Sequence, residues 1–231
     1  MDLIWDGLGE AVRIIRTGDY AIWEITLRSL LISGSAVVIS LFLGIAVGAA
    51  IAFNEFRGRN LVFSLVNTGM GLPPVVVGLL VAIFLWRSGP LGHLRLIYTP
   101  AAMVVAQTII ATPIVTGFTA AALRQLDPRW RTQIYALGAS RLQMLWIVLW
   151  ETKLPLLAAV MAGFGGAISE IGASQMVGGN LAGDTRVLTT AVMLEVNRGN
   201  FAPAIALSVI LLALIFVVSL VLTTVQQQER T

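Results

Sequence analysis

Long stretches without any charged side chain constrain the fold of this chain more than any other feature. Three of them run for roughly 26 to 28 residues each, and about 20 apolar residues already suffice for a helix to cross a bilayer. A fourth tract is also uncharged, and a fifth, between Lys153 and Gly183, is interrupted only by Glu170. The tracts are residues 29–54, 60–86, 96–123, 153–183 and 199–228. The sequence therefore predicts an all-α membrane protein with about five transmembrane helices.

Composition supports a location in the bilayer. Hydrophobic residues make up 57% of the 231 residues, only 12% are charged, and the mean hydropathy is +0.87. The net charge of +3 comes from basic residues scattered at the ends of the apolar tracts, which is typical of membrane-interface anchoring. No basic stripe is interleaved with aromatics, so we expect lipid and not nucleic acid as a partner.

The amino-terminal segment has the pattern of an amphipathic helix. Ile4, Leu8, Ala11, Val12 and Ile15 recur at helical spacing. We therefore predict an interfacial helix over residues 1–20 and one transmembrane domain over residues 21–228, which includes a cytoplasmic loop at 124–153.

The distribution of arginine predicts the orientation. Arg57 and Arg59 lie between the first two tracts and indicate a cytoplasmic loop, which places the amino terminus outside. Arg87, His93 and Arg95 would then lie in an outer loop. An odd number of spans would leave the carboxyl terminus in the cytoplasm.

The sequence has little that indicates catalysis. No glycine-rich phosphate loop surrounds Lys153, its single lysine, and the single histidine, His93, makes no metal site, so we expect neither ATP hydrolysis nor a metal in this chain. An intramembrane hydrolase that uses Ser169 or Ser174 is a competing class, but Glu170 is the one nearby base. A passive channel is a third class.

The largest polar insertion, residues 127–141, predicts a short exposed helix. Asp127 can cap it with Pro128 at its first position, and Gly138 can end it. The helix would direct Ile134, Tyr135 and Leu137 outward. Because these side chains are apolar and the chain has no ATPase motif, we expect a partner to dock on them.

This insertion resembles the coupling loop of binding-protein-dependent ABC importer permeases. The family pattern is Glu-Ala-Ala, three residues, Gly, and nine residues to Ile-x-Leu-Pro. Gly138 and Val148 match its Gly and Ile. The sequence departs from the pattern at Thr132, Gln133 and Ile134, in place of Glu-Ala-Ala, and at Trp150 and Glu151, in place of Leu-Pro.

Longer segments are similar to the permeases for molybdate and tungstate. Those shared with both are residues 72–79, 88–92, 137–140 and 169–173. The order and spacing of five others are similar to the tungstate branch: residues 162–173, 177–180, 185–190, 194–195 and 199–201. The resemblance implies a type I ABC importer permease (MetI-like) fold and import of an oxyanion, tungstate first, with molybdate or sulfate as alternatives.

The same resemblance implies partners and a location. These are a second copy of the chain, two ATP-binding cassette subunits that bind ATP and Mg²⁺, an external substrate-binding protein, and a bacterial or archaeal cytoplasmic membrane. The chain itself would hold no cofactor. Its ATPase-coupling residues would be Arg131, Ile134, Tyr135, Ala136, Leu137, Gly138, Ala139, Ser140 and Arg141.

Polar and proline residues inside apolar tracts predict a pathway. Pro73 and Pro74 remove hydrogen-bond donors and should kink the second span, and Glu170 in a bilayer costs on the order of 2 to 3 kcal/mol unless it is paired, protonated or hydrated. The expected pathway or gate residues are Pro73, Pro74, Ser169, Glu170 and Ser174. A glycine-rich polar segment follows, and its expected outer-mouth residues are Asn180, Thr185 and Arg186.

Overall fold

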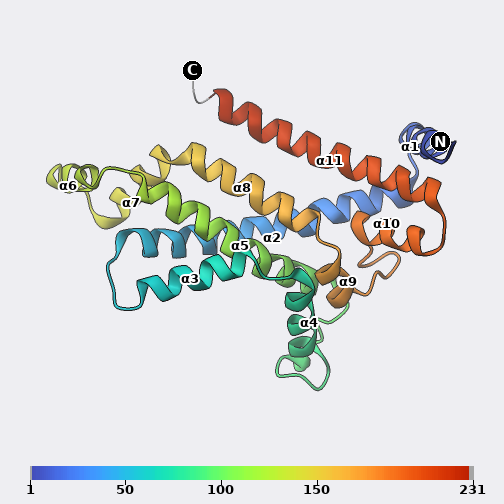
Figure 1. The fold of residues 1–231 in the computed structure, drawn as a ribbon, viewed down its shortest axis with the longest axis horizontal. Helices are drawn as coiled ribbons and strands as arrows, with labels where there is room; N and C mark the ends of the chain where they lie inside the picture. The colour runs from blue at the N-terminus through green and yellow to red at the C-terminus, as the bar shows by residue number, and fades with distance from the viewer. Residues whose placement is uncertain (1, 229–231) are drawn as a thin grey trace.

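The structure, a computed structural model, describes residues 2–228, and the described residues form helices and loops without a strand (Figure 1). The helices are α1 (Asp2–Thr17), α2 (Tyr20–Phe53), α3 (Arg59–Met70), α4 (Pro74–Leu85), the 3-10 turn η1 (Gly92–Leu94), α5 (Pro100–Arg124), α6 (Pro128–Ala136), α7 (Arg141–Glu151), α8 (Lys153–Ile168), α9 (Gly172–Gly178), α10 (Leu188–Asn197) and α11 (Phe201–Gln228). The predicted all-helical class is confirmed.

The helices account for up to five membrane spans. Three helices, α2, α5 and α11, are each long and apolar enough to cross a bilayer. Two bent pairs, α3 with α4 and α7 with α8, raise the number to five if each pair is one span. The predicted count of about five is therefore confirmed by length and composition.

The spans differ in shape from simple rods. The chain turns by 100° between α3 and α4, at the position where Pro73 and Pro74 interrupt the helix. The tract 153–183 is not one helix, because α8 ends at Ile168 and α9 begins at Gly172. At the amino-terminal side, Asp19 caps α2 by accepting a hydrogen bond from the Ala21 amide at 3.0 Å, so the first long helix begins well before residue 29.

The centre of the bundle is the contact between α2 and α5, which lie side by side in Figure 1. A Cβ atom at Gly44 would lie 2.7 Å from the Val115 side chain, and one at Gly48 would lie 2.8 Å from Thr119. Across the same contact the Ser40 hydroxyl donates to the Thr108 carbonyl oxygen at 3.2 Å. Small residues thus let the two backbones approach closely.

Helix α1 packs against α11. Ala11 and Ile14 are buried there, whereas Val12 and Ile15 remain about half exposed. On its polar face, Glu10 accepts hydrogen bonds from Arg13, which hold the pKa of the carboxyl below its usual value. The predicted helix is confirmed, while its place at the membrane surface and the division at residue 20 stay predictions.

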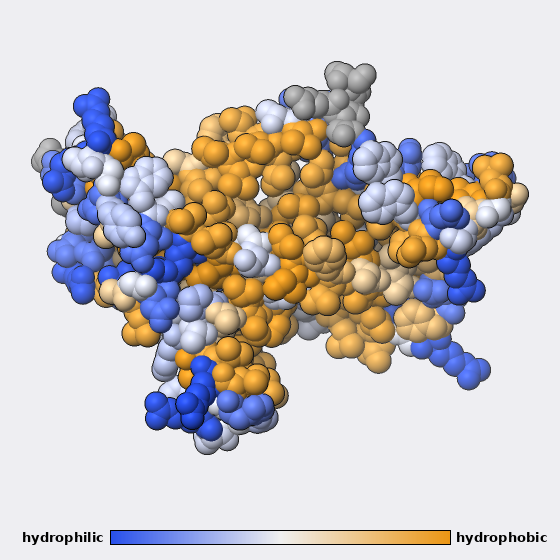
Figure 2. Space-filling view, turned by 180° about the vertical axis from the view of Figure 1, so that it is seen from behind, coloured by the Kyte–Doolittle hydropathy of each residue, from blue (hydrophilic) through white to orange (hydrophobic). Residues whose placement is uncertain are grey.

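The surface has the polarity expected of a membrane protein. Figure 2 shows an apolar band across the middle of the molecule between two more hydrophilic ends. Leu212 and Phe216 of α11 are each 65% exposed, which only a nonpolar solvent favours for side chains of this size. The α6–α7 end and the α1–α10 end therefore lie on opposite sides of the band (Figures 1 and 2).

Candidate functional site

A short helix and a tight turn form the end of the molecule farthest from α10. The Asp127 carboxylate caps α6 by accepting a hydrogen bond from the Arg129 amide at 2.9 Å. Gly138 ends the turn with a φ of +84°, a conformation that favours glycine. The helix and its two boundaries are those predicted from Asp127 and Gly138.

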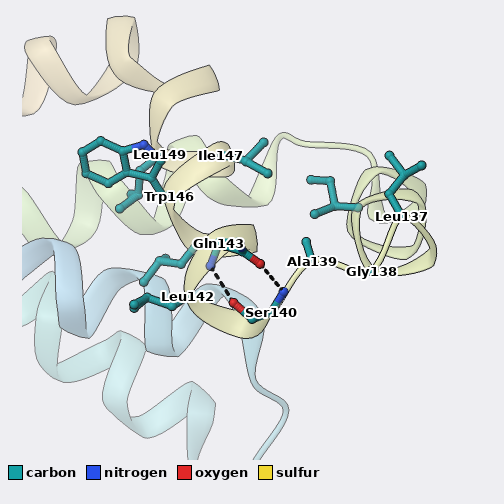
Figure 3. Close-up of a pocket in the computed structure, with 11 residues that line it drawn as sticks. Leu137, Gly138, Ala139, Ser140, Leu142, Gln143, Trp146, Ile147 and Leu149 are labelled. Atoms are coloured by element: carbon teal, nitrogen blue, oxygen red, sulfur yellow. Dashed lines mark hydrogen bonds between the residues drawn. The ribbon is translucent and has the colours of Figure 1, made fainter.

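The next helix begins immediately and forms one wall of a groove. Ser140 starts α7 with a capping box, in which the Gln143 amide donates to the Ser140 hydroxyl and the Ser140 amide donates to the Gln143 side chain (Figure 3). The groove has a volume of about 830 Å³, with Leu137 on its α6 side and Leu142 and Trp146 on its α7 side. Its lining is mainly apolar.

The apolar side chains of this end are not all directed outward. Leu137 is 87% exposed and Leu142 is 78% exposed, and Tyr135 is also exposed. Ile134 is only 8% exposed, because it packs with Leu123, Met144 and other buried residues beneath α6. The prediction that Ile134 points outward is therefore wrong: this residue attaches α6 to the bundle.

Arg131, another predicted coupling residue, makes contacts within the chain. Its guanidinium donates to the Phe53 carbonyl oxygen at 3.3 Å and lies 4.8 Å from the centre of the Phe53 ring. Arg131 thus joins α6 to the end of α2. The other predicted coupling residues remain accessible: Ala136, Gly138, Ser140 and Arg141 are exposed and Ala139 is half-buried. Their contact with an ATPase stays a prediction.

A second region of interest is the contact between α4 and α9, at the other end of α5. A Cβ atom at Gly78 would lie 2.6 Å from the Ala173 Cα, and one at Gly172 would lie 2.4 Å from the Val75 side chain. The two helices are therefore in close backbone contact. Pro73 and Pro74 set the direction of α4 and so help to create this contact, and their role in a pathway stays a prediction.

Glu170 lies in the break between α8 and α9. Its carboxylate accepts a hydrogen bond from the Ala173 amide at 3.0 Å, and its carbonyl oxygen accepts one from the Thr189 hydroxyl at 3.2 Å. The half-buried carboxylate thus satisfies a free donor at the start of α9 and connects that helix to α10. This is a structural role, and it gives Glu170 a partner of the kind that its position in an apolar tract requires; a role in a pathway or gate stays a prediction.

Replacing Glu170 tests that role. We expect Glu170→Ala to destabilise the protein by about 1 kcal/mol, because an unpaired amide remains at the start of α9. Glu170→Gln keeps an acceptor oxygen and should retain most of the stability. Thermal unfolding of the purified proteins measures both. Equal losses in the two variants would show that the negative charge, and not the hydrogen bond, is what matters.

The two serines near Glu170 make hydrogen bonds within the bundle. The Ser169 hydroxyl donates to the Gly165 carbonyl oxygen at 2.7 Å. Ser174 is fully buried and accepts a hydrogen bond from the Gln107 amide nitrogen at 3.2 Å. Ser174 therefore does not line an open path in this conformation, contrary to the prediction for it. Neither serine is hydrogen-bonded to Glu170, so this arrangement does not activate a nucleophile.

The predicted outer-mouth residues are held within their own loop. Thr185 is fully buried, donates to the Gly178 carbonyl oxygen and accepts from the Leu181 amide, so the prediction that it meets an arriving anion is wrong. The Arg186 guanidinium donates to Asn180 at 3.2 Å, and the Asn180 amide donates to the Thr190 carbonyl oxygen at 3.3 Å. Asn180 and Arg186 thus stabilise the loop between α9 and α10, and a role at the mouth stays a prediction.

Sequence reasoning missed the residue that fixes this loop. Arg28 of α2 donates to the carbonyl oxygens of Gly183 at 2.8 Å and Arg186 at 3.2 Å, and it pairs with Glu24. A Glu four residues before an Arg at the start of an apolar helix was the available signal. It was not used because the predicted span begins at residue 29, immediately after Arg28.

The fold and the exposed α6–α7 end are those of a multi-pass membrane permease. Similarity to known proteins gives the family. Residues 36–231 match the family described as the binding-protein-dependent transport system inner membrane component. The chain belongs to this family. It is thus a transport subunit of a cytoplasmic membrane, as the sequence predicts.

Individual relatives narrow the comparison. The tungstate uptake system permease protein TupB of Peptoclostridium acidaminophilum is 34% identical over 228 residues, which cover 99% of this chain and 100% of that protein. A probable anion ABC transporter permease protein of Haloferax volcanii is 40% identical over 83% of this chain and 85% of its own length. Molybdenum and sulfate transport permeases match at lower identity.

A solved structure agrees with the fold. The crystal structure of an amino acid ABC transporter with histidines superposes with a TM-score of 0.62 over 94% of this chain and 96% of that chain. Its sequence identity is 16%, so the likeness concerns the fold alone. The predicted ABC importer permease fold is confirmed.

Proposed function

We propose that this chain is the membrane subunit of an ATP-driven importer of an oxyanion, and that the oxyanion is tungstate. The support is the similarity to TupB, which extends over nearly the whole of both chains. Two copies of the chain would form the pathway, and an external binding protein would deliver the ion. Molybdate and sulfate are the next candidates, because permeases for both are related at lower identity.

The observation that carries the ATP-driven mechanism is the exposed apolar end formed by α6 and the start of α7. Leu137 and Leu142 are among the most exposed large apolar side chains of the described residues, and they belong to the α6–α7 end of the molecule. A separate ATPase that binds ATP and Mg²⁺ would cover this surface on the cytoplasmic side. Because capped helices hold the surface in a fixed shape, movement of the ATPase would be transmitted to α5 and α8.

This assignment fixes the orientation. If α6 lies in the cytoplasm, the amino-terminal end of α5 lies at the outer side of the membrane. The loop between α4 and α5, which precedes that end, then also lies outside. The amino terminus of the chain would also lie outside and its carboxyl terminus in the cytoplasm, as the arginines at 57 and 59 suggest.

Uptake by cells decides the substrate. In a strain that lacks this subunit, we expect tungstate accumulation from a nanomolar supply to fall at least tenfold and to return when the chain is supplied again. Excess molybdate and excess sulfate are tested as competitors, because permeases for both ions match this chain at similar identity, 27% and 28%. Unchanged tungstate accumulation together with lost molybdate uptake would transfer the assignment to molybdate, and unchanged uptake of both would reject the oxyanion assignment.

A further inference from the structure

The loop between α4 and α5 carries a cavity with two arginines that the pathway described above does not use. The cavity has a volume of about 770 Å³ and is lined by Trp86, Arg87, Arg95 and Tyr98 among others. It lies before α5 in the chain, whereas α6 follows α5. A helix of the length of α5, 25 residues, extends about 37 Å, so the cavity and α6 are on opposite sides of the membrane.

The loop is a rigid platform. The Leu91 amide donates to the Phe84 carbonyl oxygen at 2.9 Å, and a Cβ atom at Gly92 would lie 2.3 Å from the Trp86 carbonyl oxygen. Trp86 and Tyr98 meet edge to face with their ring centres 6.1 Å apart. These contacts hold the loop backbone and the two rings, which form part of the cavity wall.

The cavity is electropositive, and no carboxylate of residues 2–228 pairs with its two arginines. No Asp or Glu occurs in the sequence between Glu55 and Asp127. The ion pairs seen in the described residues include those of Arg13, Arg28 and Arg198. Both side chains are exposed, so their guanidinium groups are available to carboxylates from outside.

The lining identifies the kind of ligand. A four-oxygen anion is much smaller than this cavity, and it would leave the exposed faces of Trp86 and Tyr98 uncovered. Arginine, tryptophan and tyrosine are the residue types enriched at the energetic centres of protein interfaces. Basic groups beside exposed rings thus favour an acidic protein surface over a free ion.

We propose that Arg87, Arg95 and the rings of Trp86 and Tyr98 form the docking site for an acidic surface of the external substrate-binding protein. The proposal rests on the function proposed above, because it requires such a protein. The proposal also connects the docking site to α9. The Tyr98 amide donates to the Val177 carbonyl oxygen at 2.8 Å, and the Tyr98 ring packs over Gly179. A protein docked at the cavity would contact Tyr98, which is hydrogen-bonded to α9. Helix α9 in turn packs against α4, and Glu170 caps its first turn.

The test uses the complete transporter, with its ATPase, in lipid nanodiscs. ATP hydrolysis is measured against the concentration of the system's purified, tungstate-loaded binding protein. We expect Arg87→Gln and Arg95→Gln each to raise the half-maximal concentration by about tenfold, with the rate at saturation kept, because rim charges act mainly on association. Raising the ionic strength should weaken wild-type docking and affect the double variant much less.

A matched control is Arg198→Gln, which removes an exposed arginine that pairs with Glu195 at 3.0 Å. ATP hydrolysis by this variant should depend on the concentration of the binding protein as it does in the wild type. An unchanged half-maximal concentration in the Arg87→Gln and Arg95→Gln double variant would overturn the docking site while leaving tungstate transport intact. Failure of the wild type to respond to any binding protein would reject the proposed function as well.

Cross-linking gives a second readout that does not depend on activity. The chain contains no cysteine, so Leu91→Cys in the loop and Leu137→Cys in the α6–α7 turn can each carry one photoreactive maleimide. The Leu91 probe should capture the binding protein, and the Leu137 probe should capture the ATPase. Capture of the ATPase from Leu91, or of lipid alone when the binding protein is saturating, would contradict the docking site.

Discussion

Leu137→Asp should reduce oxyanion uptake by at least about tenfold while the protein remains folded in the membrane. The side chain is 87% exposed, so a charge there has little effect on stability. If an ATPase covers the α6–α7 turn, however, the same carboxylate is buried against an apolar surface and the coupling contact is lost. A central interface residue typically contributes about 2 kcal/mol or more, which corresponds to this loss. Uptake and membrane protein level are measured in the same cells.

The matched control for this change is Leu181→Asp. Leu181 is also an exposed leucine, but it lies in the loop between α9 and α10, at the other end of the bundle. We expect uptake within about twofold of the wild type, since a surface substitution of this kind changes little. Equal losses in both variants would indicate a general effect of added negative charge, and full activity of Leu137→Asp would remove the turn from the coupling contact.

Local patterns in the sequence were sufficient for the apolar spans and for α6, but not for the start of α2 at Tyr20 or the break between α8 and α9. The uncharged tracts predict the spans because a bilayer admits few charges, and Asp127 with Gly138 predicts α6 because caps depend on neighbouring residues alone. The break at Pro73 and Pro74 follows from their missing amide hydrogens. The size of the bend, 100°, does not follow, since it depends on how α4 packs against α9 and α5.

Side-chain directions at the site were harder to predict, because they depend on contacts between distant segments. Ile134 and Leu137 are three residues apart and both apolar, yet one is buried under α6 and the other is exposed. Thr185 is a polar residue in a polar loop, and it is buried because it bonds to Gly178 and Leu181. The docking cavity was not predicted because its arginines were interpreted only as evidence on orientation.

These contacts place the two proposed partner sites at opposite ends of α5. The α6–α7 turn follows its carboxyl-terminal end, and the docking cavity precedes its amino-terminal end. Between them, α9 packs against both α5 and α4, and Ser174 of α9 accepts a hydrogen bond from Gln107 of α5. We therefore expect a change at either end to pass through α5 and α9, and the α4–α9 contact to be sensitive to substitution.

Gly78→Val tests this contact and should have the second large effect. The new side chain begins 2.6 Å from the Ala173 Cα, which is backbone and cannot turn away, so α4 must move from α9. Such overpacking costs about 1–3 kcal/mol, and we expect lower thermal stability of the purified protein together with nearly complete loss of uptake. The movement also disturbs α9, whose first turn is capped by Glu170 and whose end contacts Tyr98.

Gly165→Val is the matched control, because Gly165 lies in α8 with nothing within 4 Å of a Cβ atom. Valine is at least as good a helix former as glycine, so stability should be equal to or slightly above that of the wild type. If both valine variants behave alike, the close approach of α4 to α9 does not determine stability. If Gly78→Val is destabilised but still transports, the contact supports the fold alone, and coupling between the two ends must use the direct packing of α5 against α8.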